Sequence, residues 1–371
     1  MGEMTFASIT ALVSSALIIL LCRTLAPSLG LVDHPCNRRR HARTTPVVGG
    51  LGIAVGFLLS LLLLEPFNFH ADTLLAGIGL LAIVGVIDDI HDLRTFWRLL
   101  AQLAAVMLVV VYGELQVQFL GNLFGFGAVG LWVFSGVFTV LCVMLMINAV
   151  NMLDGVDGLA GGVSLVTLAG FSLVLFLDGS AAWIMPFLLG LAVGGFLPYN
   201  MRGPWRKNAS VFMGDSGSTI LGFALAWLAI YATQTESAGI YPVTVAWMLV
   251  LPAADALSLF FRRCVRGRSP LSADRWHLHH IFIRGGWSVA ITVNRLLLLQ
   301  SLLVAVGIGG WWLGLPEWLM FWPLAAFFVG YQVAMWRADR VLRLLRRYQR
   351  RKRVRAERGP GAPEEALKGS R

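Results

Sequence analysis

The chain has 371 residues, of which 57% are hydrophobic and only 13% are charged, and its formal net charge is +10. Soluble domains carry roughly 25% charged residues, so this composition excludes an ordinary soluble globular protein and indicates one that is solvated by a lipid bilayer. In a soluble protein this net charge would suggest a nucleic-acid partner. Here the basic residues gather in short loops and in the tail, so we expect no nucleic-acid partner.

Apolar segments that can cross a bilayer, each about 20 residues long, follow one another along most of the chain. We expect eleven membrane spans, of which the third and fourth are the shortest: 5–25, 47–64, 72–87, 97–113, 131–150, 158–178, 182–200, 216–234, 242–261, 290–313 and 317–336. They predict an all-α polytopic membrane protein. Between the fourth and fifth spans, residues 115–127 alternate between apolar and polar, which predicts a small β-hairpin.

The positions of lysine and arginine predict the orientation of these spans. Nearly every basic residue falls in or beside six alternate connecting segments: 26–46, 88–96, 151–157, 201–215, 262–289 and the tail from residue 337. Because basic residues collect on the cytoplasmic side, we expect a periplasmic N-terminus and a cytoplasmic C-terminus. The four cysteines all lie in spans or cytoplasmic segments, which predicts free thiols.

The chain divides into an integral membrane domain, residues 1–336, and a basic cytoplasmic tail, residues 337–371. In the first part of the tail, arginines are interspersed with five apolar residues: Val341, Leu342, Leu344, Leu345 and Tyr348. This pattern predicts a helix whose partner is the anionic inner leaflet of the membrane. A simple topology anchor explains the same charges equally well. Past residue 359 we expect disorder.

Carboxylates cluster where three of the predicted spans meet the cytoplasmic side. Asp88 and Asp89 end the third span, Asp154 and Asp157 follow the fifth, and Asp215 precedes the eighth. Carboxylates that come together repel one another unless a cation lies among them, and Mg²⁺ and Mn²⁺ prefer such oxygen ligands. We therefore expect a divalent metal site whose shell is completed by water and by substrate phosphates.

Groups that suit anions lie on the same side. The backbone around Gly214 presents N–H groups at a predicted helix start, which is a site for an anion. The loop 262–286 contributes four side chains: Arg275, His277, His279 and His280. These histidines do not predict a zinc site, because Arg275 beside them would oppose a dication. Phosphates and sugar hydroxyls fit them better.

Asp255 lies inside the ninth predicted span. An ionisable residue within the membrane is functional by default. It is only about two turns from Arg262, however, so a buried structural hydrogen bond is an almost equally good explanation. Carboxylates with a metal, beside arginines and histidines at one membrane surface, indicate phosphoryl transfer from a soluble anion to a lipid-anchored one.

Four segments, in this order, resemble the polyprenyl-phosphate N-acetylhexosamine-1-phosphate transferases: GVIDD (85–89), NAVNMLDGVDGLAGG (148–162), VFMGDSGS (211–218) and SADRWHLHH (272–280). The resemblance covers nearly the whole chain, including residues 31–50. It is strongest to the bacterial members that use undecaprenyl phosphate and UDP-GlcNAc.

The resemblance implies transfer of N-acetylglucosamine 1-phosphate from UDP-GlcNAc to undecaprenyl phosphate with release of UMP. It implies Mg²⁺ as cofactor and the bacterial inner membrane as location. The product begins O-antigen, enterobacterial common antigen or a related glycan. By this resemblance, Asp215 and Asn151 are metal ligands, and Asp88 is the base, with Asp89 beside it. Asp154 and Asp157 are acids on the nucleotide side, and Phe212 stacks on the uracil. Arg275, His277 and His279 bind the diphosphate and the sugar, with His280 next to them. We favour direct attack over an enzyme-bound phosphosugar.

Other donors and one other class stay open. The same acids serve transferases of phospho-MurNAc-pentapeptide, but their histidine run is typically followed by an acid, which HLHHIFIR (277–284) lacks. Donors carrying GalNAc or FucNAc fit the same residues. A transporter or lipid flippase is disfavoured, because its polar site should lie near the membrane midplane and these acids lie at one face.

Overall fold

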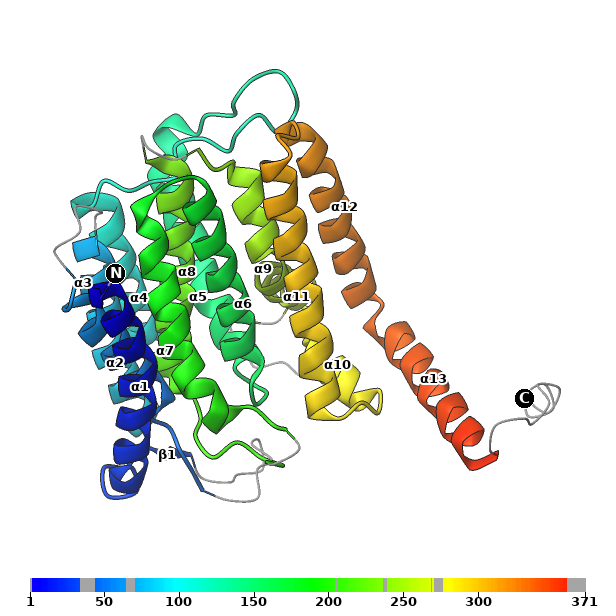
Figure 1. The fold of residues 1–371 in the computed structure, drawn as a ribbon. Coiled ribbons are helices and arrows are strands. Elements are labelled where there is room, and N and C mark those ends of the chain that lie inside the picture. Colours follow the sequence, from blue (N-terminus) through cyan, green and yellow to red (C-terminus); the bar gives the residue numbers. More distant parts are fainter. Residues whose placement is uncertain are drawn as a thin grey trace.

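The computed structural model describes residues 2–33, 44–64, 71–203, 206–235, 239–267, 269 and 276–358, and these form a helical bundle (Figure 1). The α-helices are α1 (Gly2–Leu25), α2 (Gly49–Leu61), α3 (Ala71–His91), α4 (Thr95–Met107), α5 (Ser135–Leu153), α6 (Leu159–Leu177), α7 (Ile184–Asn200), α8 (Gly214–Gln234), α9 (Pro242–Val265), α10 (Leu278–Arg284), α11 (Val289–Trp312), α12 (Glu317–Trp336) and α13 (Ala338–Arg358). A π-helical turn, Leu108–Tyr112, extends α4, and 3₁₀ turns precede α5 (Trp132–Phe134) and α7 (Ala181–Trp183).

All eleven predicted spans coincide with helices. Ten helical segments in the described part of the chain are long and apolar enough to cross a membrane, and α2 is a shorter apolar helix of 13 residues. The all-α polytopic class is therefore confirmed. The predicted hairpin at 115–127 forms no regular strands, but the segment makes an isolated antiparallel bridge between Phe119 and Gly130 and backbone hydrogen bonds such as that from Leu131 to Gln118. The one described sheet pairs β1 (Val32–Asp33) with β2 (Thr45–Pro46).

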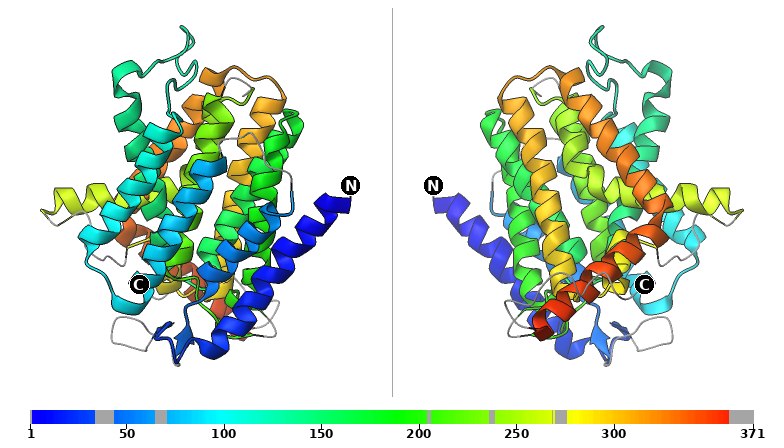
Figure 2. Two further views of the ribbon diagram at one scale, coloured as in Figure 1. Left: turned by 90° about the vertical axis from the view of Figure 1, so that its left-hand side faces the viewer. Right: turned by 90° about the vertical axis from the view of Figure 1, so that its right-hand side faces the viewer.

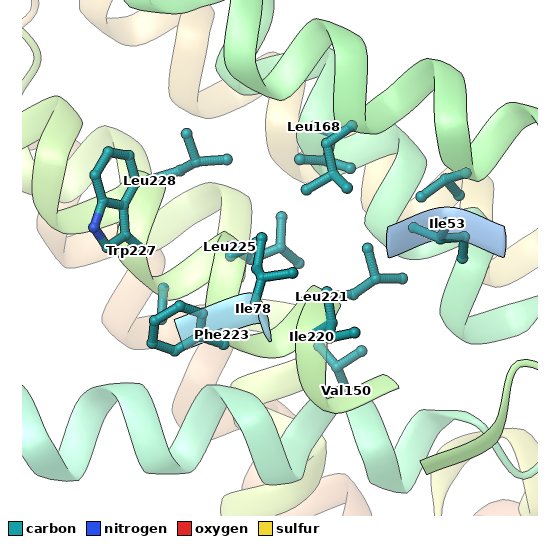
Figure 3. Packing of buried hydrophobic residues seen from close by; sticks show 14 of the residues in the cluster. Ile53, Ile78, Val150, Leu168, Ile220, Leu221, Phe223, Leu225, Trp227 and Leu228 are labelled. Atoms are coloured by element: carbon teal, nitrogen blue, oxygen red, sulfur yellow. The ribbon is translucent and has the colours of Figure 1, made fainter. Parts of the chain in front are cut away.

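Helix α8 is the centre of the bundle. Its apolar window is buried along its whole length, against α2, α3, α5 and α6, and Phe223 and Trp227 lie in the core shown in Figure 3. Small residues allow this close packing. A Cβ added at Gly222 would lie 2.5 Å from the Ile147 Cα, and one added at Gly85 would lie 2.3 Å from the Ser216 Cα.

Helix α9 leaves the bundle sideways. Pro252 lies inside this helix, and a proline in a helix interior removes a backbone hydrogen bond and kinks the helix. Figure 2 shows the C-terminal part of α9 projecting laterally from the bundle. Phe260 and Phe261 on this part are 45% and 49% exposed, so the kink presents an apolar surface beside the end of the bundle.

The sheet, α10 and the start of α13 gather at one end of the bundle (Figure 1). The ends of α3 and α5 and the beginning of α8 meet here, so the bundle itself brings the predicted acids together. Helix α13 begins directly after α12 and packs on α10: Ala338 and Leu342 are buried, whereas Leu344 and Tyr348 are exposed. The cysteines within the described residues, Cys22, Cys142 and Cys264, are free thiols.

Candidate active site

Asp89, at the end of α3, holds the start of α8. Its Oδ1 accepts a hydrogen bond from the Asp215 backbone N–H at 2.8 Å, and its Oδ2 accepts one from the Ser216 hydroxyl at 2.9 Å. A carboxylate in this place satisfies free N–H groups and complements the helix dipole. Gly214 has φ +81°, and a Cβ there would lie 2.6 Å from the Asp89 carboxylate. The N–H groups predicted to bind an anion here bind the protein's own Asp89.

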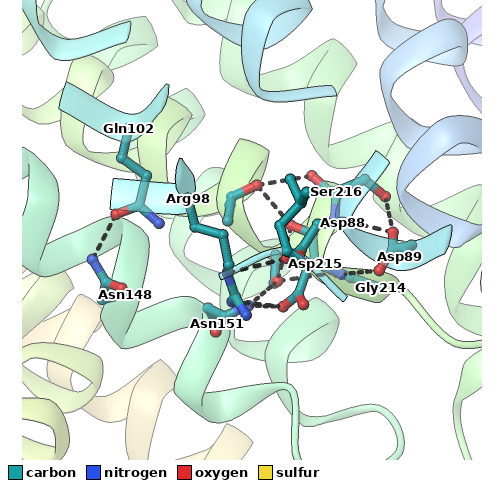
Figure 4. Close-up of polar contacts among 12 residues, drawn as sticks. Asp88, Asp89, Arg98, Gln102, Asn148, Asn151, Gly214, Asp215 and Ser216 are labelled. Carbon is teal, nitrogen blue, oxygen red and sulfur yellow. Dashed lines mark hydrogen bonds and ion pairs between the residues drawn. The ribbon is translucent and has the colours of Figure 1, made fainter. Parts of the chain in front are cut away.

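Arg98 joins the other two acids (Figure 4). Its Nε lies 3.0 Å from Asp88 Oδ2, and its second terminal nitrogen lies 3.2 Å from Asp215 Oδ1. The Asp88 side chain is only 3% exposed, whereas that of Asp215 is 30% exposed. A buried carboxylate without a partner would be strongly destabilising, so Arg98 and the Leu93 N–H (2.8 Å) stabilise Asp88. Asp215 is the acid that remains open to a ligand.

The sequence analysis did not single out Arg98, although a signal existed. Arg98 is the only charged residue within α4, whose sequence is TFWRLLAQLAAVM. A charge inside an apolar span marks a functional position by the same argument that applies to Asp255. As a basic residue beside a cytoplasmic loop, Arg98 served only as a topology signal, because its carboxylate partner Asp215 lies 117 residues further along the chain.

Asn151, near the end of α5, is a second side chain that contacts Asp215. Its amide nitrogen donates to Asp215 Oδ1 and, at 2.9 Å, to the Ser218 hydroxyl (Figure 4). The predicted pair Asn151 and Asp215 is therefore in direct contact, although they lie on different helices. The Asn151 amide and the Arg98 guanidinium both donate to the same oxygen, Asp215 Oδ1.

Negative charge is in excess around these residues. Burial, together with the charges of Asp215, Asp89 and Asp157, raises the pKa of the Asp154 carboxyl well above its usual value. Among the described residues, Arg98 pairs with Asp88 and Asp215, and Arg202 pairs with Asp157. A further cation beside these carboxylates would relieve the repulsion, so the donor set of Asp215, Asn151 and the neighbouring acids fits Mg²⁺ or Mn²⁺.

Asp157 has a different environment from Asp154. Its Oδ2 accepts from Arg202 Nε at 2.7 Å and from the Ala209 N–H at 3.1 Å. These bonds tie the α5–α6 loop to the segment between α7 and α8. Asp157 thus stabilises the contact between these two loops, and its role toward the nucleotide stays a prediction.

The histidines form a second cluster, with Asp255 at its centre. His277 Nδ1 lies 2.8 Å from Asp255 Oδ2, and the Tyr331 hydroxyl donates to Asp255 Oδ1 at 2.7 Å. Sequence proximity had indicated Arg262 as the partner of Asp255, and the carboxylate oxygens instead meet His277 and Tyr331. Asp255 also adds a carboxylate to the histidines that the sequence analysis did not expect to form a metal site: ligand atoms of Asp255, His277 and His279 all lie within 4.8 Å of one another, close enough to hold a metal ion.

The loop that carries Asp154 brings the two clusters together. A Cβ added at Gly155 would lie 3.5 Å from His279 Nε2, a buried nitrogen without a hydrogen-bond partner in the described structure. Burial and the neighbouring His280 and His277 hold the pKa of His279 well below its usual value. A neutral imidazole with a free ring nitrogen therefore faces the acidic loop.

The remaining predicted residues lie around these clusters. The Phe212 backbone bonds to Pro46 and Gly49 beside the sheet, and the His280 ring lies 4.3 Å from that of His279. Arg275 lies outside the described residues.

Known proteins are similar to this chain over most of its length. The family model described as glycosyl transferase family 4 matches residues 72–233. Proteins named undecaprenyl-phosphate alpha-N-acetylglucosaminyl 1-phosphate transferase, from Escherichia coli K12 and Salmonella typhimurium LT2, are each 34% identical to the chain. These alignments cover 94% and 93% of this chain and 95% of each relative. A Haemophilus influenzae protein of the same name is 32% identical over 90% of this chain and 95% of its own.

Proposed function

We propose that this chain, which belongs to glycosyl transferase family 4, transfers N-acetylglucosamine 1-phosphate from UDP-N-acetylglucosamine to undecaprenyl phosphate. The products are undecaprenyl-diphosphate-N-acetylglucosamine and UMP. One observation carries the proposal: acids from three helices, one arginine and a histidine cluster meet at a single end of a membrane-spanning bundle. Such an end can receive a soluble nucleotide sugar and a lipid phosphate together.

Both substrates are anions, so the protein must neutralise and align them. The lipid phosphate oxygen attacks the β-phosphorus, the bond from that phosphorus to the α-phosphate oxygen breaks, and UMP leaves. Phosphoryl transfer of this kind depends on positioning and charge stabilisation more than on covalent chemistry by the protein. When bound, Mg²⁺ at Asp215 and Asn151 would neutralise charge on the diphosphate.

Arg98 suits the phosphate of the acceptor. Its guanidinium is 28% exposed and shared between Asp88 and Asp215, and guanidinium binds phosphate as well as carboxylate in a bidentate manner. A phosphate that draws Arg98 away would leave the buried Asp88 without its cation, and Asp88 would then gain basicity. Transfer of Arg98 from Asp88 to the acceptor phosphate would therefore make Asp88 a base when the acceptor binds.

The histidine cluster and the loop after α5 suit the donor. His277 and His279 offer ring nitrogens to phosphate oxygens or sugar hydroxyls, and the loop that carries Asp154 and Asp157 passes beside His279 at Gly155. In this arrangement the uracil would stack on Phe212. Arg275 would add a cation from the same loop.

We further propose the bacterial inner membrane as the location, with the clustered end on the cytoplasmic side. Donors of this kind are cytoplasmic, and the basic loops accord with that orientation. The exposed Leu344 and Tyr348 of α13 lie among arginines and would contact the anionic inner leaflet. The product would enter O-antigen, enterobacterial common antigen or related glycan synthesis.

A donor panel tests the proposal. Purified protein in detergent receives undecaprenyl phosphate and Mg²⁺, and UMP release is followed from UDP-GlcNAc, UDP-GalNAc, UDP-FucNAc and UDP-MurNAc-pentapeptide. We expect lipid-dependent, EDTA-sensitive release with UDP-GlcNAc, and activity restored by Mg²⁺ or Mn²⁺. Release with another donor alone would keep the reaction and change the sugar. No release by folded protein with any donor would refute the proposed function.

A further inference from the structure

Asp255 is a buried carboxylate whose oxygens are both occupied by donors. Asp255 lies in α9 with 3% exposure. Its Oδ1 accepts from the Tyr331 hydroxyl at 2.7 Å and from the Leu278 backbone N–H at 3.1 Å, and its Oδ2 lies 2.8 Å from His277 Nδ1. Tyr331 lies in α12, and His277 and Leu278 lie at the start of α10. The Asp255 side chain in α9 therefore links three helices.

This geometry determines which nitrogen of His277 carries a proton. A carboxylate that accepts two other hydrogen bonds is itself an acceptor, so the contact with Nδ1 requires a proton on Nδ1. The neutral ring then presents Nε2 with a free lone pair, and the carboxylate also stabilises the ring if Nε2 gains a proton. The Leu278 N–H, in the residue directly after His277, fixes the backbone to the same carboxylate. Both the tautomer and the orientation of His277 are thereby set.

The position of His277 explains why its orientation matters. Its side chain is 7% exposed, and its ring lies parallel to that of His279 at 5.2 Å. His279 in turn faces Gly155 in the acidic loop. A ring held at this place has Nε2 available to a group that enters between the histidine cluster and the acids.

We infer that Asp255 and Tyr331 are positioning residues that hold His277 with Nε2 available to the sugar phosphate of the donor. This inference rests on the proposed function, because it assigns the donor as the ligand of His277. Asp255 does not touch substrate in this arrangement. It acts through His277, as the aspartate of a carboxylate–histidine pair does elsewhere.

The first test is a double-mutant cycle. Asp255→Asn keeps the shape of the side chain but can present an amide N–H to Nδ1, which favours the opposite tautomer. We expect kcat/KM for UDP-GlcNAc to fall about 100-fold, whereas KM for undecaprenyl phosphate stays within about twofold. In a His277→Gln background the same change should add less than about threefold, because coupled residues lose their effect together. Tyr331→Phe, which keeps the carboxylate, should cost about tenfold.

The second test does not depend on turnover. Magic-angle-spinning NMR of protein labelled with ¹⁵N-histidine, in liposomes, reports which ring nitrogen is protonated, and His277→Gln identifies the signal. We expect a protonated Nδ1 in the wild type and a change in Asp255→Asn. An unchanged signal, or an equal loss of rate in both backgrounds, would overturn the inference. One equivalent of zinc in the purified protein that disappears in Asp255→Asn would overturn it as well, since the cluster would then be a metal site.

These outcomes separate the inference from the function on which it rests. A wild type that releases UMP while Asp255→Asn keeps full donor kcat/KM refutes only the positioning role. A wild type that is inactive with every donor refutes the proposed function, and the NMR signal still decides the tautomer of His277. Thermal unfolding of each variant identifies any loss that is due to misfolding.

Discussion

The acidic cluster and the histidine cluster share one end of the bundle but are built in opposite ways. Around Asp215, Arg98 is shared between Asp88 and Asp215 while Asp89 and Asp154 add further negative charge, and Asp215 itself is 30% exposed. Around Asp255, one carboxylate receives three donors and is 3% exposed. The acidic cluster has more negative than positive charge, so its side chains can change partners. In the histidine cluster both oxygens of Asp255 are hydrogen-bonded, so His277 and Tyr331 are held in one arrangement.

This difference separates two tasks that a transferase must perform. A site that receives a cation and two anions needs charges that can change partners as each ligand arrives. A side chain that must meet the donor at a fixed angle needs partners that do not exchange. We therefore expect substitutions of Asp88, Arg98 and Asp215 to change metal and acceptor dependence, and substitutions in the histidine cluster to change donor use alone.

The largest effect is expected for Asp215→Asn. Loss of the exposed carboxylate should lower turnover by about 10³-fold or more, as removal of a central charge-stabilising group does, and saturating Mg²⁺ should not restore it. UMP release over a Mg²⁺ titration measures this. Asp92→Asn, on an exposed residue with φ +50° that asparagine adopts readily, is the matched control. Near-normal turnover of Asp215→Asn at high Mg²⁺ would remove this residue from the metal site.

Arg98→Ala should have the next largest effect, about 100-fold on kcat/KM for undecaprenyl phosphate, because a buried or desolvated charge contact is worth about 2–3 kcal/mol. Arg98→Lys should recover part of this loss, since lysine keeps the charge but not the bidentate fork. The exposed Arg94, just before α4, provides the control as Arg94→Ala. An equal loss with UDP-GlcNAc as the varied substrate would contradict the acceptor role.

Gly214→Ala should cost about tenfold in turnover and lower the melting temperature. The left-handed backbone at φ +81° costs a non-glycine residue about 1–2 kcal/mol, and the new methyl group would press on the Asp89 carboxylate. Gly79→Ala in α3, where an added Cβ meets nothing within 4 Å, is the control and should not destabilise the protein. Melting curves of both variants in detergent compare them directly.

The smallest expected effect is a pH-dependent gain in stability for Asp154→Asn. The pKa of Asp154 is raised in the folded protein, so its ionised form costs stability as pH rises above the ordinary aspartate value of about 4. The melting temperature of Asp154→Asn should therefore exceed that of the wild type by a margin that grows from pH 5 to pH 8. Mg²⁺ should reduce this margin by neutralising the acids. Asp157→Asn, which breaks the pair with Arg202, should instead lower the melting temperature at pH 7.

The spans and the acids were predictable from the sequence because both are local patterns. A run of 20 apolar residues is visible without any partner, and the five acids beside span ends are visible once the spans are drawn. The partners of Asp215 and Asp255 were not predictable in this way. Arg98 and Asp215 lie 117 residues apart, and Asp255 and Tyr331 lie 76 apart, so only helix packing brings them together. The nearest basic residue to Asp255 in sequence, Arg262, suggested the wrong partner for the same reason.

Helix α8 bears on where Asp215 lies in the membrane. Its apolar window is buried against protein along its whole length, and its first turns hold Ser216, Ser218 and Thr219 among glycines. In the folded protein this helix therefore contacts its helical neighbours, rather than lipid, along its apolar window. The position of Asp215 in the membrane therefore depends on the packing of α2, α3, α5 and α6 around α8, and a substitution that loosens any of these helices would also displace this acid.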